Sequence, residues 1–179
     1  MLVFANISFP SCPEGIALTP ARDNTTSAGN LVEIQAERAL NITSLSLNLN
    51  SGTSAINVYL NRDPLNETAF ADSSAWTLLG NLTVNSPGPA SVSGQLTSLG
   101  NDVLDIPMAE GERITLIVYQ SNATSVRSTT SDNLGAIWHN AVNLRVFQGY
   151  EIAANGATPF NSTLSFPRGV NWRIFYTCL

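Results

Sequence analysis

The sequence predicts an all-β protein, folded as an antiparallel β-sandwich of the jelly-roll or immunoglobulin-like type. Apolar and polar residues alternate with a period of two along most of the chain, which is the spacing of a half-buried strand. No stretch has the spacing of a convincing amphipathic helix. The alternating runs recur roughly every 8–15 residues and are separated by Gly, Pro, Asn, Asp and Ser. This rhythm of short strands and turns is typical of β-sandwiches.

Ten segments carry the strand pattern. They are residues 2–7, 31–37, 40–50, 55–61, 76–84, 92–97, 103–107, 113–120, 144–152 and 170–179. Between the fourth and fifth of these, residues 67–75 are predicted to form a short helical turn, which is too short to change the fold class.

Three of these strands indicate which side chains face the core. In the fifth strand one side carries Trp76, Leu78, Leu82 and Val84, and the other carries Thr77, Leu79, Asn81 and Thr83. In the last strand the core side carries Val170, Trp172, Ile174, Tyr176 and Cys178. The apolar phase of residues 40–50 shifts between Ile42 and Leu45, which predicts a β-bulge near Thr43 and Ser44. Trp76 and Trp172 are interpreted as packing residues.

Composition limits the function classes. A chain of 179 residues with 44% apolar content is long enough for one domain with a substantial core. Only 12% of the residues are charged, about half the usual share, and the net charge is −5. Its positive charges are eight scattered arginines, and it contains no lysine. Binding to nucleic acid or to anionic lipid requires clustered positive charge, so both functions are disfavoured.

The first thirty residues differ in character from the rest. The apolar residues Leu2, Val3, Phe4, Ala5 and Ile7 predict a short strand, which three prolines and a polar stretch then follow. The predicted organisation is an N-terminal strand with a proline-containing tether at residues 1–30 and a β-sandwich domain at residues 31–179. The leading strand is either an edge strand of the same sandwich or a strand donated to a neighbouring copy.

Sequons for N-linked glycosylation are the strongest signal of location. Seven Asn-x-Ser/Thr triplets occur where the composition predicts roughly four by chance. The acceptor residues are Asn6, Asn24, Asn41, Asn66, Asn81, Asn122 and Asn161. Glycosylated asparagines lie on the surface of secreted proteins, so an extracellular or cell-surface location with covalent N-glycans is predicted. Asn6 lies inside the proposed donor strand, so sugar there would restrict how that strand docks.

The two cysteines lie near opposite ends of the chain, at Cys12 and Cys178. In a secreted protein they most simply form one disulfide, which would stabilise the fold by about 4–5 kcal/mol through chain entropy. Two unrelated buried thiols, or a bridge between subunits, are the alternatives.

No catalytic or cofactor motif is present, and a non-enzymatic protein without cofactor or metal is predicted. The single histidine, His139, has no neighbouring Cys or Glu with which to form a zinc site. The chain has no Gly-x-Ser-x-Gly nucleophile motif, and nothing selects a pair among its thirteen carboxylates. Residues 63–72 are interpreted as a solvated acidic loop, since they lack the spacing of a calcium loop.

Six segments resemble, in order, a family of largely uncharacterised secreted β-sandwich modules of bacterial surface proteins. They are residues 41–49 (NITSLSLNL), 52–59 (GTSAINVY), 75–80 (AWTLLG), 106–111 (IPMAEG), 166–168 (FPR) and the closing strand 172–177. The resemblance covers residues 33–177 and implies the fold, but no catalytic or ligand-binding residue. The cysteine pair and the sequons depart from the bacterial pattern and suggest a glycosylating host. With its leading strand the chain is also similar in architecture to protomers of glycan-coated extracellular fibrils.

The leading hypothesis is a structural protomer of an extracellular glycosylated filament or surface coat, assembled from copies of itself by β-strand complementation. The alternative is a carbohydrate-binding or adhesive module, in which exposed aromatic residues such as Trp138 or Tyr150 contact glycans. A hydrolase is a third class that no motif supports. The expected partners are therefore further copies of the chain and glycans, without nucleic acid or membrane insertion.

Overall fold

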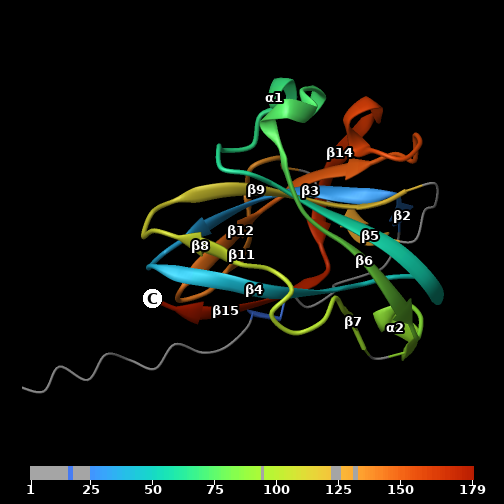
Figure 1. The fold of residues 1–179 in the computed structure, drawn as a ribbon, viewed down its shortest axis with the longest axis horizontal. Helices are drawn as coiled ribbons and strands as arrows, with labels where there is room; N and C mark the ends of the chain where they lie inside the picture. The colour runs from blue at the N-terminus through green and yellow to red at the C-terminus, as the bar shows by residue number, and fades with distance from the viewer. Residues whose placement is uncertain (1–15, 18–24, 94, 122–125, 131–132) are drawn as a thin grey trace, which may run out of the picture.

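A computed structural model of the chain describes residues 16–17, 25–93, 95–121, 126–130 and 133–179. The described chain is all-β, with antiparallel sheets and very little helix, which confirms the predicted class (Figure 1). The strands are β1 (Ile16–Ala17), β2 (Thr25–Ser27), β3 (Gly29–Ala36), β4 (Leu40–Leu47), β5 (Gly52–Asn61), β6 (Thr77–Ser86), β7 (Thr97–Ser98), β8 (Ile106–Met108), β9 (Arg113–Gln120), β10 (Val126–Thr130), β11 (Ile137–Asn140), β12 (Leu144–Phe147), β13 (Gly149–Ile152), β14 (Leu164–Val170) and β15 (Trp172–Cys178). The helical segments are α1 (Glu67–Ala71), α2 (Ala90–Ser93) and the 3₁₀ turns η1 (Ser73–Ala75) and η2 (Pro159–Asn161).

The strands form a smaller and a larger sheet. In the smaller sheet the order is β1-β15-β4, and both β7 and β8 pair with the far edge of β4. In the larger sheet the order is β2-β10-β14-β13-β3-β9-β5-β6, with β12 pairing beside β13 on β3, and β11 on β12. The first and last described strands, β1 and β15, therefore lie side by side.

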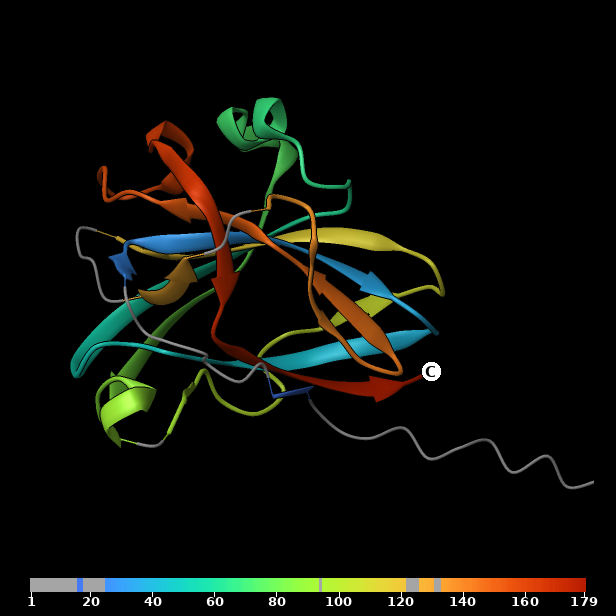
Figure 2. The same cartoon turned by 180° about the vertical axis from the view of Figure 1, so that it is seen from behind.

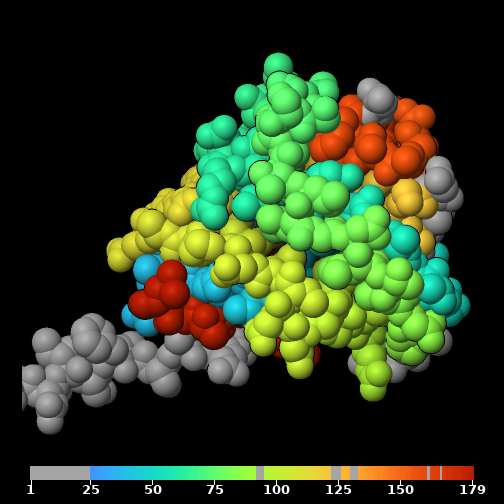
Figure 3. Space-filling view, viewed as in Figure 1, coloured from blue at the N-terminus to red at the C-terminus, as the bar shows by residue number. Residues whose placement is uncertain are grey.

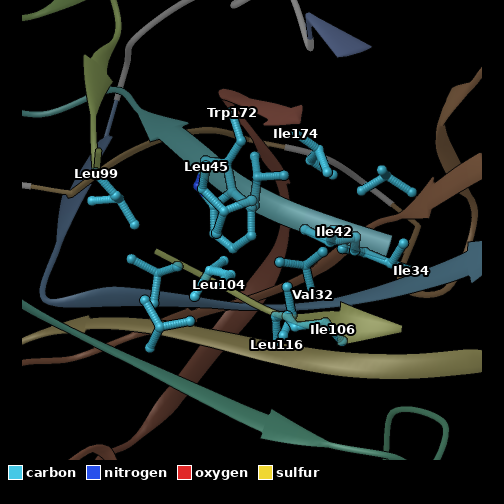
Figure 4. Packing of buried hydrophobic residues seen from close by; sticks show 14 of the residues in the cluster. Val32, Ile34, Ile42, Leu45, Leu99, Leu104, Ile106, Leu116, Trp172 and Ile174 are labelled. Atoms are coloured by element: carbon cyan, nitrogen blue, oxygen red, sulfur yellow. The ribbon is translucent and has the colours of Figure 1, made fainter. Parts of the chain in front are cut away.

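One apolar core takes side chains from both sheets (Figure 4). The smaller sheet contributes Ile42 and Leu45 from β4 and Trp172 from β15, all fully buried. The larger sheet contributes Ile34 from β3 and Leu116 from β9, which are also fully buried. Because strand side chains alternate between faces, each sheet supplies every second residue to this core.

A second apolar cluster covers the outer face of the larger sheet. There Tyr59, Ile117 and Tyr119 project away from the first core, and the helical segments α1 and η2 fold over them. Phe160 from η2 packs edge-on against Tyr59, with ring centroids 5.1 Å apart, and Phe70 from α1 is buried beside it. Figure 2 shows these segments standing together on one side of the larger sheet. The larger sheet is thus buried on both faces over much of its area.

The predicted strands match the observed ones best where apolar alternation is strong. Residues 113–120 coincide with β9, and the segment 67–75 contains α1 and η1 as predicted. Residues 144–152 form two strands, β12 and β13, because the chain moves along β3 between them. The prediction for residues 92–97 was wrong, since this region begins in α2 and joins β7 only at Thr97. Four strands rich in polar residues were missed, namely β2, β10, β11 and β14.

The predicted bulge in β4 is confirmed. Ser44 lies opposite Phe175 and Ile42 opposite Tyr176, so Thr43 is the additional residue. The core-facing pattern predicted for the last strand is also confirmed, because Trp172, Ile174 and Tyr176 are buried in the first core.

The prediction for the faces of β6 was wrong at its beginning. A register shift opposite Val58 and Tyr59 inserts Leu79, which reverses the alternation. Leu79 therefore packs toward the first core with Leu82 and Val84, while Trp76 belongs to the outer cluster. Leu78 is consequently 52% exposed, whereas Asn81 points outward as predicted.

The folded region begins before residue 31. β2 pairs with β10 and β3 begins at Gly29, so residues 25–30 belong to the larger sheet. β1 joins the smaller sheet at its edge. The predicted strand at residues 2–7 lies outside the described residues. Within the described part of the chain, no helix has the length and apolar character needed to cross a membrane.

The close approach of β13 to β3 generates a stability prediction. A Cβ at Gly149 would lie 1.7 Å from the carbonyl oxygen of Leu31, whereas a Cβ at Gly80 would meet only side-chain atoms of Leu82 at 3.6 Å or more. We expect Gly149→Ala to lower the free energy of unfolding by about 1–3 kcal/mol, because backbone must move to accept the methyl group. Gly80→Ala is the matched control and should cost little. Chemical denaturation measures both, and equal stability of the two variants would contradict the packing described.

Candidate functional site

A hollow of about 270 Å³ opens on the outer face of the larger sheet, beside the second apolar cluster. Its base comes from β3, β9, β12 and β13, and its walls come from the segments before and within α1 and before β11. The lining residues are Glu33, Leu65, Glu67, Arg113, Leu134, Gly135, Phe147 and Tyr150. It exists because the covering segments stop short of the end of the sheet at which Arg113 begins β9.

An ion pair forms the base of the hollow. The Glu33 side chain is 8% exposed, and its Oε1 lies 2.8 Å from Nη1 of Arg113. The other oxygen, Oε2, accepts a hydrogen bond of 2.7 Å from the backbone N–H of Leu65. The Arg113 guanidinium also lies over the ring of Phe147, 4.7 Å from its centroid. These contacts compensate a carboxylate that burial alone would destabilise.

A second polar pair forms the wall. The hydroxyl of Tyr150 donates a hydrogen bond to Oε1 of Glu67, which lies in the first turn of α1. Burial, followed by the hydrogen bond to Glu67 and the negative charge of Glu67, raises the pKa of Tyr150 to about 12. Tyr150 therefore stays protonated at neutral pH, which leaves its oxygen available as an acceptor and fixes the position of Glu67.

The arrangement offers a ligand both polar and apolar contacts. It places two carboxylates, one guanidinium and one phenol around a half-open space whose other surfaces are apolar. Nothing in the described ranges groups three or more His, Cys, Asp or Glu residues closely enough to hold a metal ion. Polar groups that converge on a partly apolar hollow are the usual composition of a ligand site.

The two aromatic residues predicted to be exposed and to contact glycans have different positions. Tyr150 lines the hollow but is only 9% exposed, so the prediction that it is an exposed aromatic residue was wrong. Trp138 packs against the first core. The Trp138 indole N–H donates a hydrogen bond of 2.9 Å to the carbonyl of Val170, and its ring lies directly over Gly169, where a Cβ would be 2.3 Å away. His139 lies next to it on β11, half-buried, and burial lowers its pKa. It does not line the hollow.

The acidic segment before β6 uses its side chains as helix caps. Asn66 accepts a hydrogen bond from the N–H of Thr68 at the start of α1, and Asp72 does the same for Ser74 at η1. The bonds to Ser74 also lower the pKa of Asp72. These roles fit the interpretation of a solvated loop.

The described sequons differ in exposure. Asn66 and Asn81 are exposed, the first at the N-cap of α1 and the second on β6. Asn41 lies within β4, half-buried, and its Nδ2 donates a hydrogen bond of 2.9 Å to Asp105. Asn6, Asn24 and Asn122 lie outside the described residues, as does the side chain of Asn161.

One partner of the predicted disulfide, Cys178, lies at the end of β15, which is next to the edge strand β1 of the smaller sheet. β1 and β15 pair antiparallel, with Ile16 opposite Ile174 and Ala17 opposite Arg173. Cys178 packs against the first core, and Cys12 lies outside the described residues, so the bond stays a prediction.

A second hollow, of about 440 Å³, lies on the outer face of the smaller sheet at the β4 bulge. It is lined by Thr43, Ser44, Asn101, Asp102, Phe175, Tyr176 and Thr177. Its carboxylate, that of Asp102, stands on a turn with positive φ, and no arginine faces it. It offers fewer converging charged groups than the first hollow.

Sequence reasoning missed Glu33, Glu67, Arg113 and Phe147 as site residues. One signal was available, because Glu33 interrupts the apolar run of β3 at a position where a buried charge needs a partner. The partner is 80 residues distant in the chain, so the pattern alone could not name it.

Comparisons of the chain with known protein families, curated proteins and solved structures found no match.

The exposure of the sequons generates a prediction about occupancy. We expect sugar on Asn66 and Asn81, and little on Asn41, because a transferase must reach the amide nitrogen and that of Asn41 is held by Asp105. Glycopeptide mass spectrometry of protein from a glycosylating host measures each site. Higher occupancy at Asn41 than at Asn81 would contradict this ranking.

The Tyr150–Glu67 pair generates a prediction about pH. Glu67→Gln should move the pKa of Tyr150 from about 12 part of the way toward the ordinary value of 10.0, since burial remains while the negative charge is removed. The neutral phenol of Tyr150 stabilises the folded state. This stabilisation is fully present below the pKa that Tyr150 has in the unfolded chain, and it is lost as the pH rises from about 10 toward 12. Tyrosinate absorbance measures this, with Tyr150→Phe identifying the signal. An unchanged alkaline titration in Glu67→Gln would disprove the coupling.

Proposed function

We propose that this chain is a glycosylated β-sandwich protomer of an extracellular filament or surface coat, in which one copy donates residues 1–9 to a neighbour. The observation that carries the proposal is the position of β1. It lies at the edge of the smaller sheet, where it pairs with β15 on one side only among the described strands. The apolar segment with Leu2, Val3, Phe4, Ala5 and Ile7 precedes this edge strand in the sequence.

The larger sheet offers an edge that suits such a strand. β6 is a ten-residue strand that pairs with β5, and no other described strand pairs along its far edge. Figure 3 shows β6 on the surface between α1 and α2. Natural edge strands are commonly protected by charges or proline, and β6 contains neither. Added main-chain hydrogen bonds, each worth about 0.5–1.5 kcal/mol, would combine with burial of Leu78.

Head-to-tail donation of this kind propagates without closing. The donor segment and the β6 edge are different surfaces of the same chain, so each copy would offer one and accept through the other. The exposed sequons and the low content of charged residues support an extracellular assembly, because attached sugar would maintain hydration of a surface that has few charges.

Glycan binding is the second candidate function. One observation favours it, namely the hollow that Glu33, Arg113, Glu67 and Tyr150 surround. The two functions are compatible, since the hollow and the β6 edge involve different residues.

The assembly proposal predicts that deleting residues 1–10 abolishes filaments and leaves a soluble monomer, because the donor strand is removed while Cys12 and its predicted disulfide are kept. Negative-stain electron microscopy and light scattering measure the outcome. Leu78→Lys should also suppress assembly, because a lysine on the edge opposes strand addition. Val142→Lys makes a comparable change at a residue that is 82% exposed on the β11–β12 turn, and it should assemble normally. Filaments that persist after the deletion would refute donation by this segment.

A further inference from the structure

We propose that the hollow on the outer face of the larger sheet binds a neutral saccharide residue, with Glu67, Arg113 and Tyr150 as its polar contacts. The inference rests on the described side chains of this hollow, and it does not depend on assembly into filaments.

The charges of the hollow are mixed in sign, which favours a ligand without net charge. Two carboxylates, from Glu33 and Glu67, disfavour an anion, and the protein as a whole carries a net charge of −5. A simple cation would be repelled by the guanidinium of Arg113. The Nη1 atom of Arg113 lies 2.8 Å from Oε1 of Glu33, so the guanidinium already neutralises that buried carboxylate. A ligand without net charge avoids both repulsions.

The hydrogen-bonding groups of the hollow can pair with the hydroxyl groups of a sugar. Glu67 accepts from Tyr150 through Oε1, and a carboxylate has about four acceptor positions, so it can accept further donors. The phenol donates its proton to Glu67 and can accept one in return. Arg113 engages Glu33 through Nη1, and a guanidinium carries five N–H donors in all. A sugar hydroxyl both donates and accepts, which this mixture of acceptors and donors requires.

The size and the apolar walls agree with one sugar ring. The hollow of about 270 Å³ is small, which favours a single residue over an extended chain inside it. Leu65 and Leu134 provide apolar surface for the C–H face of a pyranose. Leu134 is 44% exposed, so the apolar surface that it would bury on binding is at present in contact with water.

The position of the hollow identifies two sources for such a ligand. Leu65 and Glu67 line it, and Asn66, the acceptor of an exposed sequon, lies between them. The saccharide is therefore either part of a separate glycan or a residue of the glycan attached to Asn66 itself, of the same or a neighbouring copy. Both sources present the same hydroxyl chemistry.

A single substitution separates the sources. Thr68→Ala destroys the sequon but keeps Asn66, whose cap on α1 uses the backbone N–H of residue 68. The full-length glycosylated protein and its Thr68→Ala variant are probed with an array of neutral, acidic and basic mono- and disaccharides, followed by calorimetric titration up to about 10 mM. Binding to Thr68→Ala alone would support occupation by the Asn66 glycan, and equal binding to both would support a separate glycan.

Variants within the hollow test the contacts, and each is made in the Thr68→Ala background. We expect Glu67→Gln and Tyr150→Phe to weaken binding of a neutral saccharide by about tenfold each, since the first removes the charge of an acceptor and the second removes the hydroxyl that contacts the ligand and holds Glu67. Glu110→Gln makes the same change of charge on an exposed turn outside the hollow and should leave affinity unchanged. Far-ultraviolet circular dichroism confirms that each variant is folded.

Three results would overturn the proposal. They are the absence of binding of every neutral saccharide to Thr68→Ala, a preference for acidic or basic compounds, and equal affinity of the Glu67→Gln and Tyr150→Phe variants with their parent.

Discussion

The fold depends on burial of the larger sheet on both of its faces. Antiparallel sheets commonly bury one face and expose the other, which gives strict alternation of apolar and polar residues. Here β3 and β9 carry long, nearly continuous apolar runs, because Ile34 and Leu116 serve the core between the sheets while Leu31 and Ile117 serve the outer cluster. The outer cluster requires a cover, and the segments around α1 and η2 provide it with Phe70, Trp76 and Phe160.

The candidate binding site follows from the limits of that cover. Where the covering segments end, the outer face of the sheet changes from apolar to charged, and Glu33 stands at this boundary with Arg113 as its partner. Only Glu33 is buried in this pair, since the Arg113 side chain is 42% exposed, and an ion pair open to solvent contributes little net stability. Removal of Arg113 would leave the buried carboxylate of Glu33 without its compensating charge. The pair is better understood as a rigid polar base for the hollow than as a source of stability.

Arginine is used sparingly and locally in this protein. Within the described part of the chain, four arginines form ion pairs with glutamates, at Arg62–Glu112, Arg113–Glu33, Arg145–Glu37 and Arg168–Glu151. The positive charge is thus distributed among individual partners over several strands. A surface with few unpaired charges presents mainly backbone edges, hydroxyls and amides to its surroundings.

The sequence by itself determined the all-β class, the extent of β9, the helical turn before β6, the bulge at Thr43 and the inward face of β15, because each depends on local apolar periodicity. It did not determine the strands β2, β10, β11 and β14, which carry little apolar periodicity. β2 and β10 are ordered by pairing with strands distant in the chain, and β11 forms a hairpin with β12. Tertiary structure alone decided the reversal of faces at Leu79, because a bulge against β5 places it. Tertiary structure also decided which residues form the hollow. The sequence suggested Tyr150 as an aromatic contact, but its neighbours Glu67 and Arg113 come from separate elements. Their meeting follows from sheet topology, which brings together residues that no local pattern relates.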